Sequence, residues 1–164
     1  EQPETATAGI PPSATHGWGV GTEFEGKKNA GGGQKVEYEY LHGPLCNQLA
    51  LCLKEVTASN QSVFVTKNVY VDAAIVDKIK QTANAIFEVK TSALPSAQIY
   101  SAVGQMHYYK YRYGHSKTKL YLVLPLSCKS TETQKFIESL GIAVVYGESG
   151  AFNFPDGVNL AADV

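Results

Sequence analysis

Three charged residues in the middle of the chain have the types and spacing of a phosphate-chemistry site. Asp72 lies in one apolar stretch, and Glu88 and Lys90 lie in the next. Residues i and i+2 of a strand point to the same face, so Glu88 and Lys90 would lie side by side. If the two stretches pair, Asp72 would join them. Buried carboxylates repel each other unless a cation neutralises them, and oxygen ligands with room for water suit Mg²⁺ or Mn²⁺.

The elements that would position these residues follow from the hydrophobic pattern. Helical spacing predicts helices over residues 44–56, 96–112 and 130–141. Runs of β-branched and apolar residues predict strands over residues 62–67, 69–76, 85–92, 119–126 and 142–147. The order α–β–β–β–α–β–α–β predicts hairpin strands followed by parallel crossovers. This is an α/β fold with a mixed sheet flanked by helices.

Two local alternatives remain open in this pattern. The first helix could extend back through residues 36–42, in which case Pro44 would kink it. Residues 73–86 also fit a helical stripe, which would create a βαβ unit. The density of β-branched and aromatic residues and the polar break at residues 80–84 favour a hairpin instead.

Composition excludes several classes of function. The chain has 164 residues, of which 44% are hydrophobic and 18% charged, and this indicates one globular domain. The net charge of −1 and the single arginine, Arg112, argue against a generally basic nucleic-acid binder. No apolar run is long enough for a membrane span. Cys46, Cys52 and Cys128 form no metal-binding or disulfide pattern, so we expect core thiols in an intracellular protein.

The chemistry-bearing residues resemble a known family, the PD-(D/E)XK or restriction-endonuclease-like nuclease superfamily. The resemblance rests on Asp72, on Glu88-x-Lys90 in the next strand, and on Gln105-Met-His-Tyr-Tyr109 in the following helix. That last motif is similar to the Q-x-x-x-Y signature of the RecB-like branch. The resemblance spans roughly residues 37–147 and implies the family's αβββαβ core with an added αβ. The family's proline before the aspartate is replaced here by Val71.

The resemblance implies a deoxyribonuclease that hydrolyses DNA phosphodiester bonds through a water activated by Mg²⁺ (or Mn²⁺). Asp72, Glu88 and the carbonyl of Val89 would bind the metal. Lys90 would orient the water and stabilise developing charge. Gln105 would support the site, completing an implied catalytic set of Asp72, Glu88, Lys90 and Gln105.

The family often places a Glu or His of the site on its first helix, and Glu39 and His42 are the candidates here. We expect the nuclease-like domain over residues 36–150. Residues 1–35 read as a flexible tail and loop with a candidate edge strand, and residues 151–164 as an irregular tail.

DNA is the implied partner. Tyr109 would contact the substrate backbone, and Lys110, Arg112 and Lys117, which are interleaved with tyrosines, would track phosphates. A solvated helix end explains the same cations equally well. A near-neutral core of this size covers little duplex, so a homodimer or fused or associated DNA-targeting domains would assist it.

Two competing classes of function remain. A nuclease-like fold can lose its metal and persist as a nucleic-acid-binding or protein-interaction domain. The intact Asp72, Glu88 and Lys90 favour an enzyme over that alternative. A βαβ small-molecule binder would require a glycine-rich phosphate loop after a strand, and this sequence lacks one.

Overall fold

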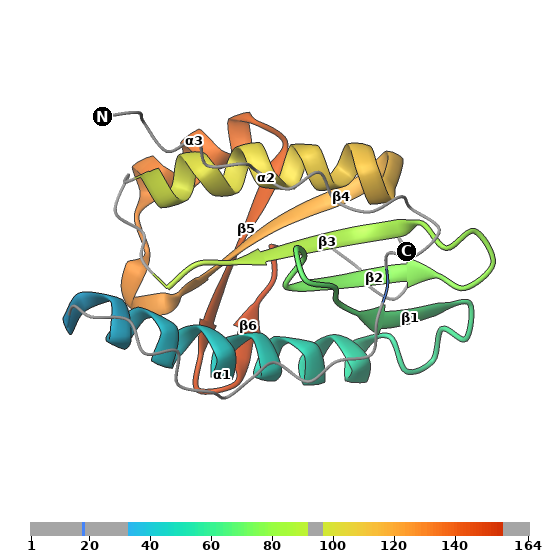
Figure 1. Ribbon diagram of the computed structural model, residues 1–164, viewed down its shortest axis with the longest axis horizontal. Helices are drawn as coiled ribbons and strands as arrows, with labels where there is room; N and C mark the ends of the chain where they lie inside the picture. Colours follow the sequence, from blue (N-terminus) through green and yellow to red (C-terminus); the bar gives the residue numbers. More distant parts are fainter. Residues whose placement is uncertain (1–17, 19–32, 92–96, 156–164) are drawn as a thin grey trace, which may run out of the picture.

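The computed structural model describes residue 18 and residues 33–91 and 97–155, leaving out the side chains of residues 33–41 and 97. Figure 1 shows a twisted sheet with α1 on one face and α2 and α3 on the other. The described part is therefore an α/β fold with a mixed six-stranded sheet and three helices, which confirms the predicted fold class. Within these residues, no helix has both the length and the apolar character needed to cross a membrane.

The strands follow one another across the sheet in chain order. The elements are α1 (Gly33–Val56), β1 (Val63–Thr66), β2 (Ala73–Asp77), β3 (Ala83–Val89), α2 (Ala97–Tyr113), β4 (Gly114–Pro125), the 3-10 turn η2 (Leu126–Cys128), α3 (Thr131–Ser139), β5 (Ile142–Glu148) and β6 (Ala151–Asn153). Strands β1, β2 and β3 pair antiparallel, β3 to β5 pair parallel, and β6 pairs antiparallel with β5. The predicted hairpins and crossovers are confirmed, and the helical alternative for residues 73–86 is wrong.

The first helix is longer than residues 44–56. It runs from Gly33 to Val56 with Pro44 inside it, so the extended alternative is the one observed. Pro44 is exposed, whereas Cys46 and Leu49 are buried against the sheet. A proline inside a helix loses one backbone hydrogen bond and crowds the carbonyl four residues earlier, but on the outer side its ring stays away from the packed face.

The second strand starts later than predicted. β2 begins at Ala73 and not at residue 69. The side chain of Asn68 accepts hydrogen bonds from the backbone N–H groups of Tyr70 and Val71, both at 2.8 Å. This side chain closes a turn that competes with strand pairing. Asp72 consequently lies directly before the strand.

Two predicted boundaries need correction. Residues 151–153 are not irregular, because they form edge strand β6 against β5. Residues 33–35 are not part of a tail, because α1 begins at Gly33. The predicted candidate edge strand and the ends of the chain lie outside the described residues. Trp18 is described, and its ring lies 5.3 Å from that of Tyr113.

The core has two layers, one on each face of the sheet. Residues of β3 alternate between them: Ile86 packs in the layer beneath α2 and α3, whereas Phe87 and Val89 pack in the layer beneath α1. Phe87 stacks on Tyr121, with ring centroids 4.7 Å apart. The same alternation places Glu88 on the face covered by α2.

Helix α2 covers the carboxylate-bearing face. Its buried stripe recurs at helical spacing and consists of Ile99, Ala102, Met106, Tyr109 and Tyr113. Gly114 then joins the helix directly to β4. A Cβ atom at Gly114 would lie 2.5 Å from Thr118 Oγ1 and 2.9 Å from the Lys110 carbonyl oxygen, so only glycine fits this junction.

Candidate active site

The pairing of β2 with β3 brings the two predicted carboxylates together. Ala73 pairs with Phe87, which places the preceding residue, Asp72, next to Glu88. The backbone N–H of Val89 donates a 2.8 Å hydrogen bond to Asp72 Oδ2. This bond ties the Asp72 side chain to the end of β3, so its position is set by the sheet and not by a mobile loop.

Glu88 is buried and only partly satisfied. Lys90 Nζ donates a 2.7 Å hydrogen bond to Glu88 Oε1, and these side chains are only 13% and 5% exposed, respectively. Glu88 Oε2 is buried and has no hydrogen-bond partner among the described residues. Burial and then the charge of Asp72 raise the pKa of Glu88 to about 7, although Lys90 and His42 oppose the rise. A buried carboxylate oxygen that lacks a hydrogen-bond partner and lies near a second carboxylate is unfavourable by itself. A bound cation would stabilise both carboxylates.

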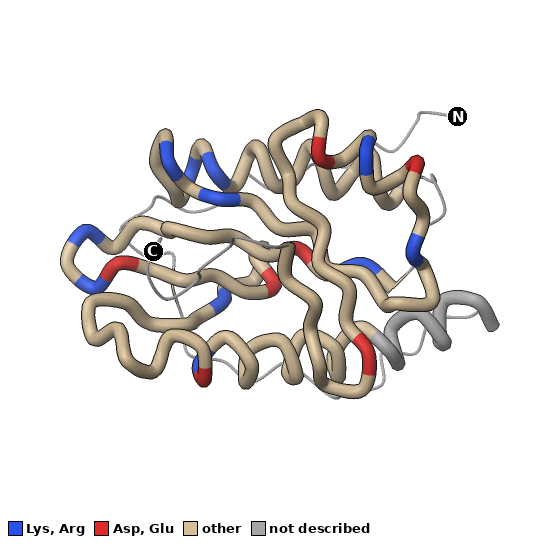
Figure 2. Tube along the Cα trace, turned by 180° about the vertical axis from the view of Figure 1, so that it is seen from behind, with Lys and Arg blue, Asp and Glu red and all other residues tan. Residues whose placement is uncertain are grey.

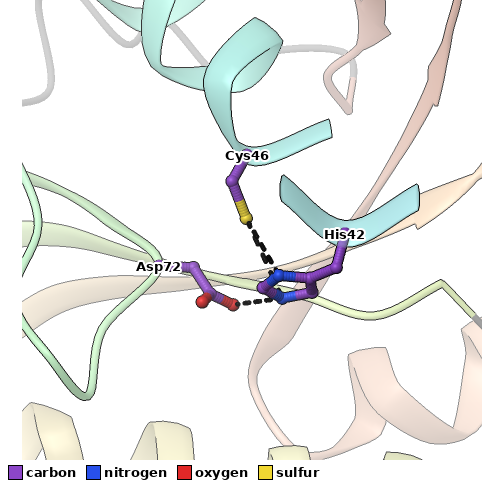
Figure 3. A group of neighbouring side chains, drawn as sticks. All are labelled: His42, Cys46 and Asp72. Atoms are coloured by element: carbon purple, nitrogen blue, oxygen red, sulfur yellow. Dashed lines mark hydrogen bonds and ion pairs between the residues drawn. The ribbon is translucent and has the colours of Figure 1, made fainter. Parts of the chain in front are cut away.

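Helix α1 adds a histidine and a cysteine to the site, as Figure 3 shows. His42 Nε2 lies 3.4 Å from Asp72 Oδ2, with side chains 23% and 17% exposed. Cys46, one turn along the helix, places its Sγ 3.7 Å from His42 Nδ1 and 3.8 Å from Nε2. His42, one of the two predicted first-helix candidates, therefore reaches the site. Glu39 also lies on α1, but its side chain is outside the described set.

Helix α2 contributes Gln105 and Tyr109 from the opposite side. Gln105 Oε1 is buried without a hydrogen-bond partner among the described residues. Tyr109 is only 7% exposed, and burial, followed by the charges of Glu88 and Asp72, raises its pKa to about 12. Tyr109 packs in the core layer beneath α2, near enough to Glu88 and Asp72 for their charges to act on its pKa, and its contact with DNA stays a prediction.

The predicted basic residues lie away from the carboxylates. Figure 2 shows lysine and arginine positions gathered at the end of the sheet where α2 runs into β4. Lys110 and Arg112 are half-buried there, and Lys117 is exposed. Glu88 pairs with Leu122, whereas Lys117 lies in an irregular part of β4 between Gly114 and Lys119. The β3 partners of Gly114 and Lys119 precede Glu88 by five and three positions, so Lys117 lies roughly 10–16 Å along the sheet from Glu88.

The donor set fits a divalent cation. Asp72 and Glu88 offer the carboxylate oxygens that Mg²⁺ and Mn²⁺ prefer, and Glu88 Oε2 is an available oxygen. Val89 is linked to Asp72 through its N–H, and a ligand role for its carbonyl remains a prediction. Sequence reasoning missed Cys46. Its spacing of four from His42 would have indicated it, had the helix been extended through Pro44.

Comparisons with known proteins add no relative. No family model, curated protein or solved structure matches the chain. The residues and their geometry alone support a functional proposal.

Proposed function

We propose that this protein is a metal-dependent deoxyribonuclease with a restriction-endonuclease-like core. The observation that carries the proposal is the convergence of Asp72, Glu88 and Lys90 at the end of β3, where Glu88 Oε2 is buried without a protein partner among the described residues. The order α1, β1, β2, β3, α2, β4, α3 and β5 supports it, because it matches the element order the family resemblance implies.

Two carboxylates would hold the cation, Mg²⁺ or Mn²⁺. The N–H of Val89 orients Asp72, and the bond from Lys90 orients Glu88 so that Oε2 remains available. When bound, the cation would supply Lewis-acid stabilisation of charge on the phosphate oxygens. Pre-positioned ligands lower the cost of binding, since little side-chain freedom is lost.

Lys90 would act on the reacting groups. Its ammonium is held beside Glu88 and is mostly buried, which strengthens its electrostatic effect relative to a solvated lysine. Placed next to the phosphate, it would donate a hydrogen bond to the attacking water or to a non-bridging oxygen. Gln105 and Tyr109 are positioning residues that close the α2 side and exclude water.

The cations near the end of the sheet where α2 joins β4 support a nucleic-acid strand as the substrate. Lys117 lies roughly 10–16 Å along the sheet from Glu88, which corresponds to about three to five nucleotides at 3.4 Å of axial rise each. A DNA strand that runs from the site towards the end of the sheet where α2 joins β4 would thus meet a cation on one side of the scissile phosphate. The small number of such contacts favours help from a second copy or an attached DNA-targeting domain.

The test is cleavage of supercoiled, linear and single-stranded DNA with Mg²⁺ or Mn²⁺. We expect Lys90→Ala to reduce the rate by about 10²–10³-fold, the scale for one preorganised charge-stabilising donor. Lys135→Ala, on the exposed side of α3, should cleave like the wild type. EDTA should abolish cleavage.

Two results would count against the enzyme. Undiminished cleavage by the Lys90→Ala variant, or cleavage that persists in EDTA, would remove this site from the reaction. If no DNA is cut while calorimetry still detects Mn²⁺ binding that Asp72→Asn abolishes, the site binds metal without catalysis. The protein would then be a nuclease-like binding domain.

A further inference from the structure

A second set of ligands lies on the α1 side of Asp72. His42, Cys46 and Asp72 each present one ligand atom, and these atoms all lie within 4.8 Å of one another. The sulfur of Cys46 is almost equidistant from the two ring nitrogens of His42, so neither nitrogen is singled out as its hydrogen-bond partner. Nitrogen, sulfur and oxygen converge here, which is a different chemistry from the two carboxylates used above.

Two of the three ligand–ligand distances are close to the edges of a tetrahedron around one ion, and the third, between the Asp72 oxygen and Cys46 Sγ, is within 4.8 Å. With Zn–N near 2.05 Å, Zn–O near 2.1 Å and Zn–S near 2.3 Å, tetrahedral angles require N···O of about 3.4 Å and N···S of about 3.6 Å. The observed distances from His42 Nε2 are 3.4 Å to Asp72 Oδ2 and 3.8 Å to Cys46 Sγ. Because Cys46 Sγ is as close to Nδ1 as to Nε2, it does not lie beyond Nε2 along its lone pair, and a side-chain rotation of His42 or Cys46 would be needed to direct both at one ion.

We propose that His42, Cys46 and Asp72 form a Zn²⁺ site. A thiolate and an imidazole favour Zn²⁺ strongly over Mg²⁺, which requires oxygen ligands. Cys46 retains a thiol, and on binding its S–H bond breaks, the proton passes to the buffer and an S–Zn bond forms. His42 and Asp72 are partly exposed, whereas Cys46 is buried.

The Zn²⁺ site would regulate the nuclease, and this part of the inference rests on the function proposed above. Asp72 belongs to both ligand sets, and its Oδ2 is the oxygen that faces His42. Zn²⁺ bound there occupies Asp72 and places positive charge beside Glu88, so Mg²⁺ cannot bind in its productive position. Zn²⁺ is therefore an inhibitor that acts through Cys46, a residue the cleavage reaction does not use.

Binding is tested first, without any cleavage, using Co²⁺ as a spectroscopic substitute for Zn²⁺. We expect the wild type to develop near-ultraviolet thiolate-to-cobalt charge-transfer absorption that Zn²⁺ removes. Cys46→Ser should abolish this absorption, because serine provides no sulfur. Cys52→Ser is the matched control on the same helix and should retain it. His42→Gln keeps the sulfur and should weaken Co²⁺ binding by on the order of 100-fold or more.

Circular dichroism would show whether each variant is folded. If Cys46→Ser is unfolded, the Co²⁺ affinity of His42→Gln tests the site instead. The site is refuted if the wild type shows no charge-transfer absorption, or if the absorption survives in the folded Cys46→Ser protein. Unchanged Co²⁺ affinity in folded His42→Gln would also overturn it.

Regulation is tested by titrating Zn²⁺ into DNA cleavage at fixed Mg²⁺. We expect folded Cys46→Ser to need on the order of 100-fold more Zn²⁺ for half inhibition than either the wild type or Cys52→Ser. Equal inhibition of the three proteins would overturn the regulatory role. Absence of cleavage with Mg²⁺ alone would overturn the proposed nuclease, whereas the Co²⁺ titration would still decide the Zn²⁺ site.

Discussion

Replacing Glu88 by glutamine should change how stability depends on pH. Glu88 is buried, and burial and Asp72 together raise its pKa from 4.5 to about 7. Between these two pH values, the folded protein holds a proton that the unfolded chain has released. The stabilisation from this group is therefore complete below pH 4.5 and is lost as the pH rises through 7. Glutamine has no such proton to lose.

The expected size follows from the same two values. At about 1.4 kcal/mol per pH unit, the interval from 4.5 to about 7 corresponds to roughly 3 kcal/mol of unfolding free energy. In metal-free solution the wild type should lose about this much stability between pH 4.5 and 8 relative to Glu88→Gln. Other titrating groups are common to both proteins, so to first order they cancel in the difference.

Urea unfolding in EDTA, followed by fluorescence of the single tryptophan, Trp18, would measure this difference. Glu132→Gln on α3 is the exposed control and should follow the wild type. Parallel profiles of unfolding free energy against pH for the wild type and Glu88→Gln would refute the reasoning.

Added metal should reverse the loss of stability. In solution without EDTA, Mg²⁺ at 100 times its dissociation constant should restore about 2.7 kcal/mol of unfolding free energy to the wild type at pH 8, and far less to Glu88→Gln.

Two further predictions concern the substrate path and the fold. Lys117→Ala should weaken DNA binding regardless of sequence and reduce the slope of log affinity against log salt by about 0.9, as measured by fluorescence anisotropy. Lys135→Ala should leave that slope unchanged, and equal slopes in both variants would exclude the phosphate contact. Gly114→Ala should cost about 1–3 kcal/mol in urea unfolding, because the added Cβ would lie 2.5 Å from Thr118 Oγ1. Gly104→Ala, where nothing lies within 4 Å, should instead stabilise α2 slightly, and similar effects at both positions would contradict this account.

Much of the fold could be predicted from local patterns of hydrophobic and turn residues in the sequence. Apolar runs with turn residues between them located five strands, and the predicted pairing of the second with the third is confirmed by Ala73 opposite Phe87. The predicted helix over residues 130–141 is also observed as α3, which the Ser130 side chain caps by accepting a hydrogen bond from the N–H of Thr133. These features depend on neighbours in sequence, so local propensity is enough to reveal them.

Local pattern failed where a distant contact decided the outcome. Pro44 left the start of the first helix open, and the structure shows one helix from Gly33 to Val56 that runs through it. Strand β6 was not predicted, because the segment is short and lies between polar residues. It becomes a strand only through its backbone pairing with β5. The burial of Tyr109 was not predicted either, because helical spacing alone does not show which face of the helix the sheet covers.

The sequence by itself determined the types of residue available: two carboxylates and a lysine on neighbouring strands, and a Q-x-x-x-Y run on the next helix. Only the tertiary structure decided their environments. Burial and packing beside Asp72 leave Glu88 Oε2 without a partner among the described residues, and α1 brings His42 and Cys46 to the same aspartate. Desolvation and convergence depend on contacts between residues far apart in the chain, so no local pattern can specify them.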